Sequence, residues 1–250
     1  MKILKYTKYK SNQYKLLLEN NEEIVLYDEI ILKYELLITK KIKNINVIIE
    51  DNKYLESYYL LLKKLNRKQL SVKEARNYLK LNGYTDYSVI DRLVKEKYLD
   101  DEKYLSSYIN TQVKLKVVGP DKIINDLIKL GFSEEDIKNK IYNIDNDIWF
   151  NKINKYLDNK IKINKKYSNN TLKQKLLLDL INKGFYKEDI VECLNKKKLN
   201  DDYEILIKDY ERISKVLKRK YTGIEYKNKL KQKLITKGYS LNDINKVINE

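Results

Sequence analysis

Residues 180–185 read Leu-Ile-Asn-Lys-Gly-Phe, and the same order of leucine, three residues, glycine and aromatic occurs four times in the 250-residue chain. The four glycines stand 48, 53 and 54 residues apart. A near-constant spacing of this kind is typical of tandem repeats. The copies cover residues 79–84, 127–132, 180–185 and 234–239, and Ile90, Ile137, Ile190 and Ile244 follow them after a short polar step.

Each copy predicts the end of one helix. Glycine adopts the left-handed backbone conformation just past a helix without the steric cost that a Cβ brings. In such a Schellman ending, the leucine four residues before the glycine contacts the aromatic residue after it. Serines followed three residues later by an acid are typical helix N-caps. The predicted helix stops are Gly83, Gly131, Gly184 and Gly238, and the predicted caps are Ser71, Ser133 and Ser240.

The composition favours an extended helical protein. The chain is 42% hydrophobic and 35% charged, with 6 glycines and 1 proline, which is too apolar for disorder and too poor in breakers for a turn-rich β protein. At the amino end, two strand-like segments, 14–19 and 23–27, flank Asn20-Asn21 and predict a hairpin, with a third strand around Ile3. We therefore predict a mainly α fold, in which tandem three-helix repeats form an elongated, curved array after a small N-terminal domain containing a β-hairpin.

Five parts are expected along the sequence. Residues 1–51 form a strand-rich region with short helices near 28–36 and 44–50. The repeats follow at 52–100, 101–148, 149–199 and 200–250. Apolar residues recur at three and four positions in the first helix of each repeat, which predicts helices at 54–65, 102–115, 148–161 and 203–217.

The residue inventory excludes much enzyme chemistry. The protein has no histidine and one cysteine, which removes the usual proton shuttle and thiolate metal sites, and it has no glycine-rich phosphate loop. Acids at 100–102, 134–136 and 201–202 fall at predicted helix starts, where they are better read as caps than as catalytic groups. Cys193 and Trp149 are expected in the core. We predict a non-enzyme without metal or cofactor.

The first residues and the hydropathy predict a cytoplasmic protein. Lysines recur through the first ten residues, so no signal-peptide core is present, and no apolar run approaches the roughly 20 residues that span a bilayer. No membrane partner is expected.

The net charge of +16 is unevenly distributed, with +1 in residues 1–51 and +15 in residues 52–250. Cations recur at the end of each first helix, and in stacked repeats such clusters form a stripe suited to a periodic polyanion. The alternative is that these lysines only offset helix dipoles and maintain solubility. The candidate phosphate- or filament-binding residues are Lys63, Lys64, Arg67, Lys68, Lys114, Lys116, Lys122, Lys160, Lys162, Lys165, Lys166, Lys218, Arg219 and Lys220.

The sequence resembles the RecX family of bacterial recombination regulators. The resemblance rests on residues 71–84, 90–93, 98–104 and 119–132, with Lys97 standing where a glycine is common in the family. The two middle repeats carry the strongest match. The family motif residues are Tyr98, Leu99, Asp100, Asp101, Glu102, Gly119 and Pro120.

The resemblance implies a non-enzymatic modulator of the RecA recombinase, and we expect a monomer. Family members bind the RecA filament on single-stranded DNA and suppress its ATPase, strand-exchange and coprotease functions, and thereby influence DNA repair, recombination and the SOS response. Two alternatives remain open: a basic helical solenoid that binds nucleic acid without a recombinase, and a scaffold for an acidic protein partner.

Overall fold

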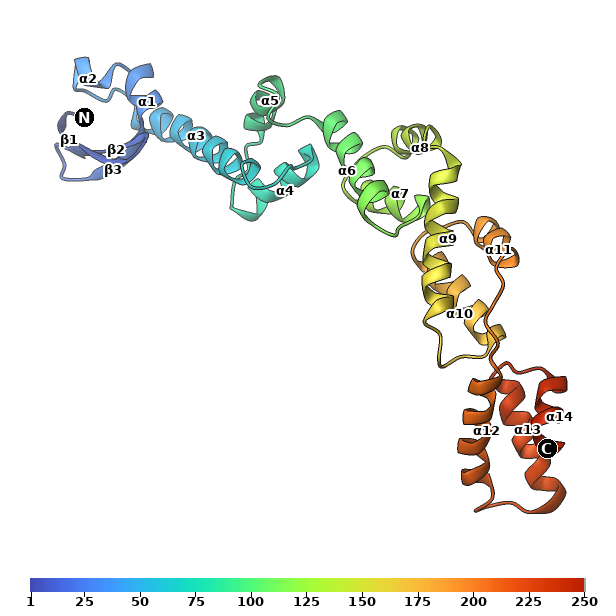
Figure 1. The fold of residues 1–250 in the computed structure, drawn as a ribbon. Coiled ribbons are helices and arrows are strands. Elements are labelled where there is room, and N and C mark those ends of the chain that lie inside the picture. The colour runs from blue at the N-terminus through green and yellow to red at the C-terminus, as the bar shows by residue number, and fades with distance from the viewer. Residues whose placement is uncertain (250) are drawn as a thin grey trace. The chain divides into compact units, whose positions relative to one another are not determined.

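The computed structural model describes residues 1–249, which contain fourteen helices and one small sheet. The predicted class, mainly α with a strand-containing amino end, is confirmed (Figure 1). The molecule divides into two compact units, Met1–Tyr104 and Leu105–Glu250, each of which is described by itself. None of the helices within the described residues combines the length and apolar character required to cross a membrane.

The amino end folds as an antiparallel sheet of β1 (Ile3–Lys10), β2 (Gln13–Leu18) and β3 (Glu23–Tyr27), in the order β1-β2-β3. The predicted hairpin and third strand are therefore confirmed. Asn21 takes a left-handed conformation in the turn, and Leu16 pairs with Ile24 across the hairpin. Side chains from one face of the sheet form a buried core with side chains of the short helices α1 (Asp28–Lys33) and α2 (Leu36–Thr39).

Helix α3 (Ile45–Leu65) is one 21-residue helix, where the sequence analysis predicted separate helices at 44–50 and 54–65. That prediction was wrong because no glycine or proline interrupts this stretch and Asn52 does not break it. The Asn52 side chain is buried, accepts a hydrogen bond from Tyr27 N at 3.0 Å and donates to Val25 O at 3.2 Å. Asn52 thereby joins the helix to β3. The expected boundary at residue 51 lies inside α3, and the division into five parts stays a prediction.

Three further sets of helices follow α3 and its partners. The observed first helices begin and end within two residues of the predicted ranges 102–115, 148–161 and 203–217. The elements are α4 (Val72–Leu81), α5 (Ser88–Lys95), α6 (Asp101–Leu115), α7 (Pro120–Lys129), α8 (Glu134–Tyr142), α9 (Asn146–Lys162), α10 (Asn169–Asn182), α11 (Lys187–Asn195), α12 (Tyr203–Leu217), α13 (Gly223–Thr236) and α14 (Leu241–Asn249).

All four predicted Schellman endings are present. In each copy the aromatic N–H donates to the leucine C=O at 3.1–3.3 Å, and the glycine N–H donates to the carbonyl three residues earlier at 2.8–3.1 Å. The four glycines have φ values between 82° and 98°. The predicted serine caps are also confirmed, since Ser71, Ser133 and Ser240 each accept a hydrogen bond from the amide three residues later.

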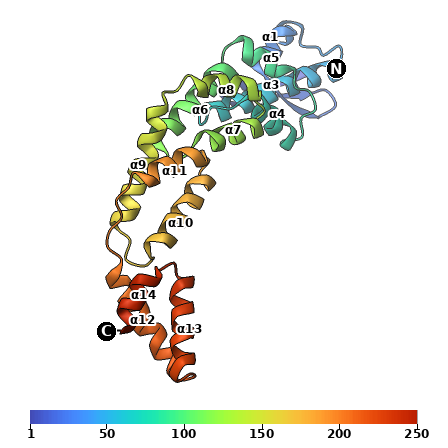
Figure 2. The ribbon, with the colours of Figure 1, turned by 90° about the vertical axis from the view of Figure 1, so that its right-hand side faces the viewer.

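In the second unit, the turns at Gly184 and Gly238 also dock on the start of a helix in the preceding repeat. Gly119 N donates to Lys183 O at 2.8 Å and Asp121 N donates to Gly184 O at 3.0 Å, which fixes the 184 turn against α7. A Cβ on Gly119 would lie 2.2 Å from Gly184 O, so only glycine fits at this contact. Figure 2 shows α10 and α11 beside α9 in this unit.

The turn at Gly238 docks in the same way on the start of α10. The Ser168 and Thr171 hydroxyls donate to Lys237 O at 2.6 and 2.7 Å, and the Asn170 amide donates to Gly238 O at 2.9 Å. Two successive repeat junctions therefore share one arrangement, in which the end of one second helix contacts the beginning of another.

Acids at two repeat starts cap helices of the preceding repeat. Asp101 Oδ1 accepts from Val72 N at 2.8 Å, and Asp202 Oδ2 accepts from Asn169 N at 2.7 Å. At the corresponding position of α7 stands Pro120, which has no N–H to satisfy. The interpretation of the two clusters as caps of the helices they begin is confirmed for Asp100 and Asp201, which accept from Lys103 N at 2.9 Å and Tyr203 N at 3.0 Å. That Asp101 and Asp202 cap another helix was not predicted.

The buried side chains of the second unit form two clusters. One extends over α6 to α11 and contains Trp149 and Cys193, as predicted, with exposures of 4% and 2%. The other comes from α12 to α14 and the turn before α14. The same repeat buries a carboxylate, Asp209, which the sequence did not reveal. Asp209 accepts from Tyr239 Oη at 2.9 Å and pairs with Lys237 at 3.0 Å, so it binds α12 to the last glycine turn.

Lys97 occupies the left-handed position of a fifth Schellman ending, at the end of α5. Its φ is 61°, Tyr98 N donates to Leu93 O at 2.9 Å, and Lys97 N donates to Val94 O at 3.0 Å. A Cβ at such a position carries a steric cost that glycine lacks. Lys97→Gly should therefore raise the free energy of unfolding by about 0.5 to 1 kcal/mol.

The measurement for Lys97→Gly is urea unfolding followed by far-ultraviolet circular dichroism. Lys97→Ala is the matched control, because it removes the same charge and keeps the Cβ, and its stability should stay near that of the unmodified protein. Equal stabilisation by both substitutions would contradict the steric explanation and assign the effect to the charge.

Candidate functional site

The first cationic cluster lies at the end of α3, in the first unit. Lys63, Arg67 and Lys68 are exposed, whereas Lys64 is half-buried with its Nζ 5.0 Å from the centre of the Tyr78 ring. Lys68 is paired with Glu74 at 2.8 Å. Three of these four predicted residues are therefore without an acidic partner within 4 Å in the described part of the protein.

The second cluster lies at the end of α6, in the second unit, where Lys114 and Lys116 are both exposed. Next to it stands Lys152 of α9, a residue that the sequence analysis missed. The Lys152 Nζ donates to Gln112 O at 3.2 Å and to Lys116 O, and burial lowers the pKa of this lysine. Lys152 thus caps carbonyls at the end of α6 from another helix, an arrangement that periodicity within one helix does not reveal.

The third cluster comes from the end of α9 and the segment before α10, where Lys160, Lys162, Lys165 and Lys166 are all exposed. Two further features belong to it. The centre of the half-buried Tyr167 ring lies 5.5 Å from Lys166 Nζ and 4.7 Å from Lys175 Nζ, so two ammonium groups make cation–π contacts with one ring.

The Lys160 side chain lies over a second ring of this cluster, that of Tyr156, with its Nζ 5.5 Å from the ring centre. Burial and the hydrogen bond to Asp179 raise the pKa of Tyr156 to about 12, so the phenol stays protonated. The hydrogen bond from Tyr156 in turn lowers the pKa of Asp179. Asp179 is thereby engaged by Tyr156 and also pairs with Lys183 at 3.4 Å.

The fourth cluster, Lys218-Arg219-Lys220, follows α12 and is fully exposed. Lys122 differs from all the others, because it lies in the first turn of α7, pairs with Asp126 at 2.7 Å and packs against the Gly184 turn. Among the described residues, twelve of the fourteen predicted cations have no carboxylate within 4 Å, the exceptions being Lys68 and Lys122. Unpaired exposed cations in groups are suited to attract a polyanion.

The predicted family-motif residues lie at two repeat junctions, Tyr98 to Glu102 in the first unit and Gly119 with Pro120 in the second. Leu99 is buried, Tyr98 is 55% exposed, and Asp100 accepts a hydrogen bond from Lys103 N at 2.9 Å. Asp101 caps α4, and Gly119 and Pro120 begin α7 where the Gly184 turn docks. Except for the exposed Tyr98 and for Glu102, the contacts of these residues are those of a structural joint.

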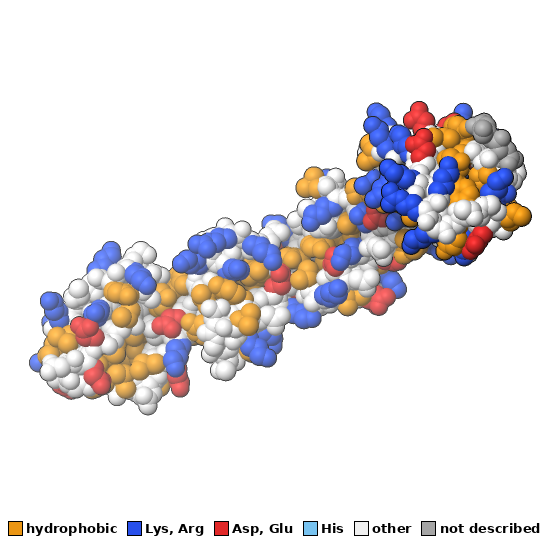
Figure 3. All heavy atoms as spheres, turned by 90° about the horizontal axis from the view of Figure 1, so that it is seen from below, with side chains coloured by type: hydrophobic (Ala, Val, Ile, Leu, Met, Phe, Trp, Pro, Cys, Tyr) orange, Lys and Arg blue, Asp and Glu red, His pale blue; other side chains and the backbone are white. Residues whose placement is uncertain are grey.

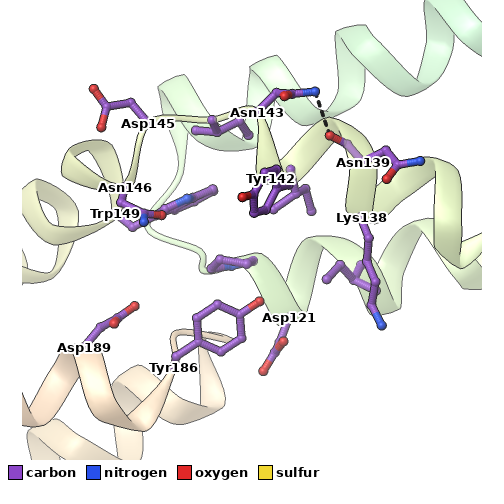
Figure 4. A pocket seen from close by; sticks show the side chains of 14 residues that line it. Asp121, Lys138, Asn139, Tyr142, Asn143, Asp145, Asn146, Trp149, Tyr186 and Asp189 are labelled. Atoms are coloured by element: carbon purple, nitrogen blue, oxygen red, sulfur yellow. Dashed lines mark hydrogen bonds between the residues drawn. The ribbon is translucent and has the colours of Figure 1, made fainter.

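A hollow of about 970 Å³ in the second unit opens between the starts of α7, α9 and α11 and the helix α8. In Figure 4 the Trp149, Tyr142 and Tyr186 side chains surround it, and Asp121 and Asp189 lie on either side of Tyr186. Asn143 donates to Asn139 O at 2.9 Å on the rim. Burial raises the pKa of Tyr186 and of Asp189, and neighbouring acids raise both further.

The carboxylates of this hollow belong to helix starts. Asp145 accepts from Asp147 N at 2.9 Å at the beginning of α9, and Asp121 and Asp189 lie in the first turns of α7 and α11. Negative side chains at these positions complement three helix dipoles. The described residues contain no group of three or more acids or cysteines placed to bind a metal ion.

The fold and surface define the class of the protein: a tandem three-helix repeat protein with grouped, unpaired cations. No family model matches the sequence. The chain is 28% identical over 262 residues to Regulatory protein RecX of Streptococcus gordonii, covering 100% of this chain and 99% of that protein. It is 29% identical over 256 residues to Regulatory protein RecX of Streptococcus pyogenes serotype M4, covering 98% and 97%.

Two solved structures share the fold. A crystal structure of regulatory protein RecX aligns with a TM-score of 0.63 at 18% identity, covering 78% of this chain and 99% of the other. RecX from Lactobacillus salivarius aligns with a TM-score of 0.52 at 20% identity, covering 57% and 95%. Together with the full-length sequence similarities, these matches confirm the resemblance to the RecX family.

Proposed function

We propose that this protein is a non-enzymatic regulator that binds the RecA filament on single-stranded DNA and inhibits its ATPase, strand-exchange and coprotease activities. The observation that carries the proposal is the similarity, over the whole length, to proteins named Regulatory protein RecX. The protein would act as a monomer in the cytoplasm, lie in the helical groove of the filament, and thereby modulate DNA repair and recombination.

The cationic clusters support this proposal. Lys114 and Lys116 lie at or just after the end of α6, and Lys162 and Lys165 lie at or just after the end of α9. Both pairs are exposed and lack acidic partners among the described residues. A filament on DNA presents phosphates and acidic protein surface at regular intervals, which is the kind of ligand that repeated cations attract. We assign these clusters to the contact with the filament.

The test is the single-stranded-DNA-dependent ATPase rate of the cognate recombinase, measured with amounts of this protein well below one per recombinase protomer. We expect the rate to fall at such ratios and to stay low when competitor DNA is added, because the filament is the target. Loss of the effect with extra DNA would instead support a basic solenoid that only sequesters DNA. No effect in either condition would overturn the proposal.

A further inference from the structure

The last repeat contains a second basic feature, a shallow groove between α12 and α13. Its volume is about 350 Å³, and no acidic residue lines it. Three lysines line it, Lys220 from the connection after α12 and Lys229 and Lys233 from α13. The other lining residues are Val216, Leu217, Tyr221, Gln232 and Thr236.

The charge around this groove is strongly one-sided. Residues 215–236 contain eight lysines and arginines and one acid, Glu225. Figure 3, a view from below, shows Lys and Arg side chains gathered over one part of the C-terminal repeat, at the right of the picture. In the described part of the protein, Lys220, Lys229 and Lys233 are all exposed and none has a carboxylate within 4 Å. The groove therefore concentrates positive charge that the protein itself does not neutralise.

The two lysines on α13 are placed like contacts to a regularly spaced anion. Lys229 and Lys233 are four residues apart, so they lie on the same face of the helix and about 6 Å apart along its axis. Like charges at this spacing repel each other unless an anion lies between or over them. A rise of about 3.4 Å per nucleotide places alternate phosphates of a strand at a similar interval.

We propose that the groove between α12 and α13 binds the phosphodiester backbone of a nucleic-acid strand. Lys229 and Lys233 contact phosphates on one side and Lys220 on the other, while the Gln232 amide offers an uncharged donor between the two α13 lysines. The ammonium groups act as mobile point charges. They can bind the phosphates of a nucleic-acid backbone, and such contacts give no sequence preference. This inference deepens the proposed function and rests on it for the source of the strand.

The test compares two pairs of substitutions on α13 in the full-length protein. Lys229→Gln with Lys233→Gln removes two charges from the groove. Lys227→Gln with Lys231→Gln removes two charges from the same helix at positions that do not line the groove. Binding to a short fluorescein-labelled oligothymidylate is measured by fluorescence anisotropy over a series of salt concentrations.

We expect the groove pair to weaken oligothymidylate binding about tenfold at moderate salt and to reduce the salt slope by about two, one for each lost phosphate contact. The control pair should change the affinity less than about threefold. Equal losses from both pairs would overturn the proposal, because binding would then depend only on net charge.

Two further readouts separate this inference from the proposed function. If the groove pair leaves oligothymidylate binding unchanged but weakens binding of polyglutamate, the groove takes an acidic peptide and the proposal is overturned. The ATPase assay is run on the same variants and on the unmodified protein. Inhibition by the unmodified protein, together with unchanged oligothymidylate binding by the groove pair, would refute the groove alone and leave the proposed function standing.

Discussion

Replacing Gly184 by alanine should lower the free energy of unfolding of the second unit by about 3 to 5 kcal/mol. Two costs combine at this position. The φ of +84° disfavours any residue with a Cβ, and the added Cβ would lie 2.3 Å from the backbone nitrogen of Lys122. Because the Cβ would clash with the backbone of Lys122, α7 must move away. This movement weakens the hydrogen bonds that Gly119 N and Asp121 N make to the turn, and each bond contributes about 1 kcal/mol to the free energy of unfolding.

Gly223→Ala is the control for this prediction. Gly223 also lies in the second unit and has a φ of +58°, but a Cβ there would meet no atom within 4 Å. Its loss should be only about 1 kcal/mol, the conformational cost alone. Trp149, the single tryptophan, is buried in the second unit, so urea unfolding followed by its fluorescence reports on the right region. Equal losses for the two variants would show that the docking contact contributes nothing.

Reversing the charge of two residues at or just after the end of α9, with Lys162→Glu and Lys165→Glu together, should weaken inhibition of the recombinase about tenfold or more. Two attractions to phosphate or acidic surface become two repulsions. Both side chains are exposed and neither has an acidic partner among the described residues, so the fold should be unaffected. A second variant, Lys114→Glu with Lys116→Glu, tests the cluster after α6 in the same way.

The control for charge reversal is Lys5→Glu with Lys8→Glu on the exposed β1 strand, which changes the net charge by the same amount. It should reduce inhibition by less than about threefold. The readout is the ATPase titration, with circular dichroism to verify folding. Unchanged inhibition by both cluster variants would show that these lysines have no part in the mechanism. An equal loss in the control would show that the effect depends only on net charge.

Local sequence patterns predicted the helix ends because the interactions that stop a helix lie within a few residues of one another. The pattern from Leu180 to Phe185 contains both partners of its two hydrogen bonds. Docking of the same turn on Gly119 joins residues far apart in the sequence, so no local pattern contains it. The unbroken α3 was missed for a related reason, since the contacts that hold Asn52 come from β3.

In the candidate site too, local features could be predicted from the sequence and contacts between helices could not. Clusters at the ends of first helices follow from helix boundaries, and the structure places them there. Lys152 was not predictable, because its contacts depend on how α9 packs against the end of α6. The groove lysines Lys229 and Lys233 lie on α13, and only its packing against α12 brings them to Lys220. The available signal was a helix rich in lysine and poor in acids from residue 227 to 236.

The docking of one glycine turn on the next helix start also bears on how such a sequence diverges. At the α7 junction the hydrogen bonds run from backbone N–H to backbone C=O, so the register between these two repeats requires glycines and little other residue identity. Surface positions are then free to change over generations while neighbouring repeats keep their alignment. A fold shared at only 18% identity is the outcome that such a backbone joint permits, and the array becomes a scaffold on which binding surfaces vary independently of its architecture.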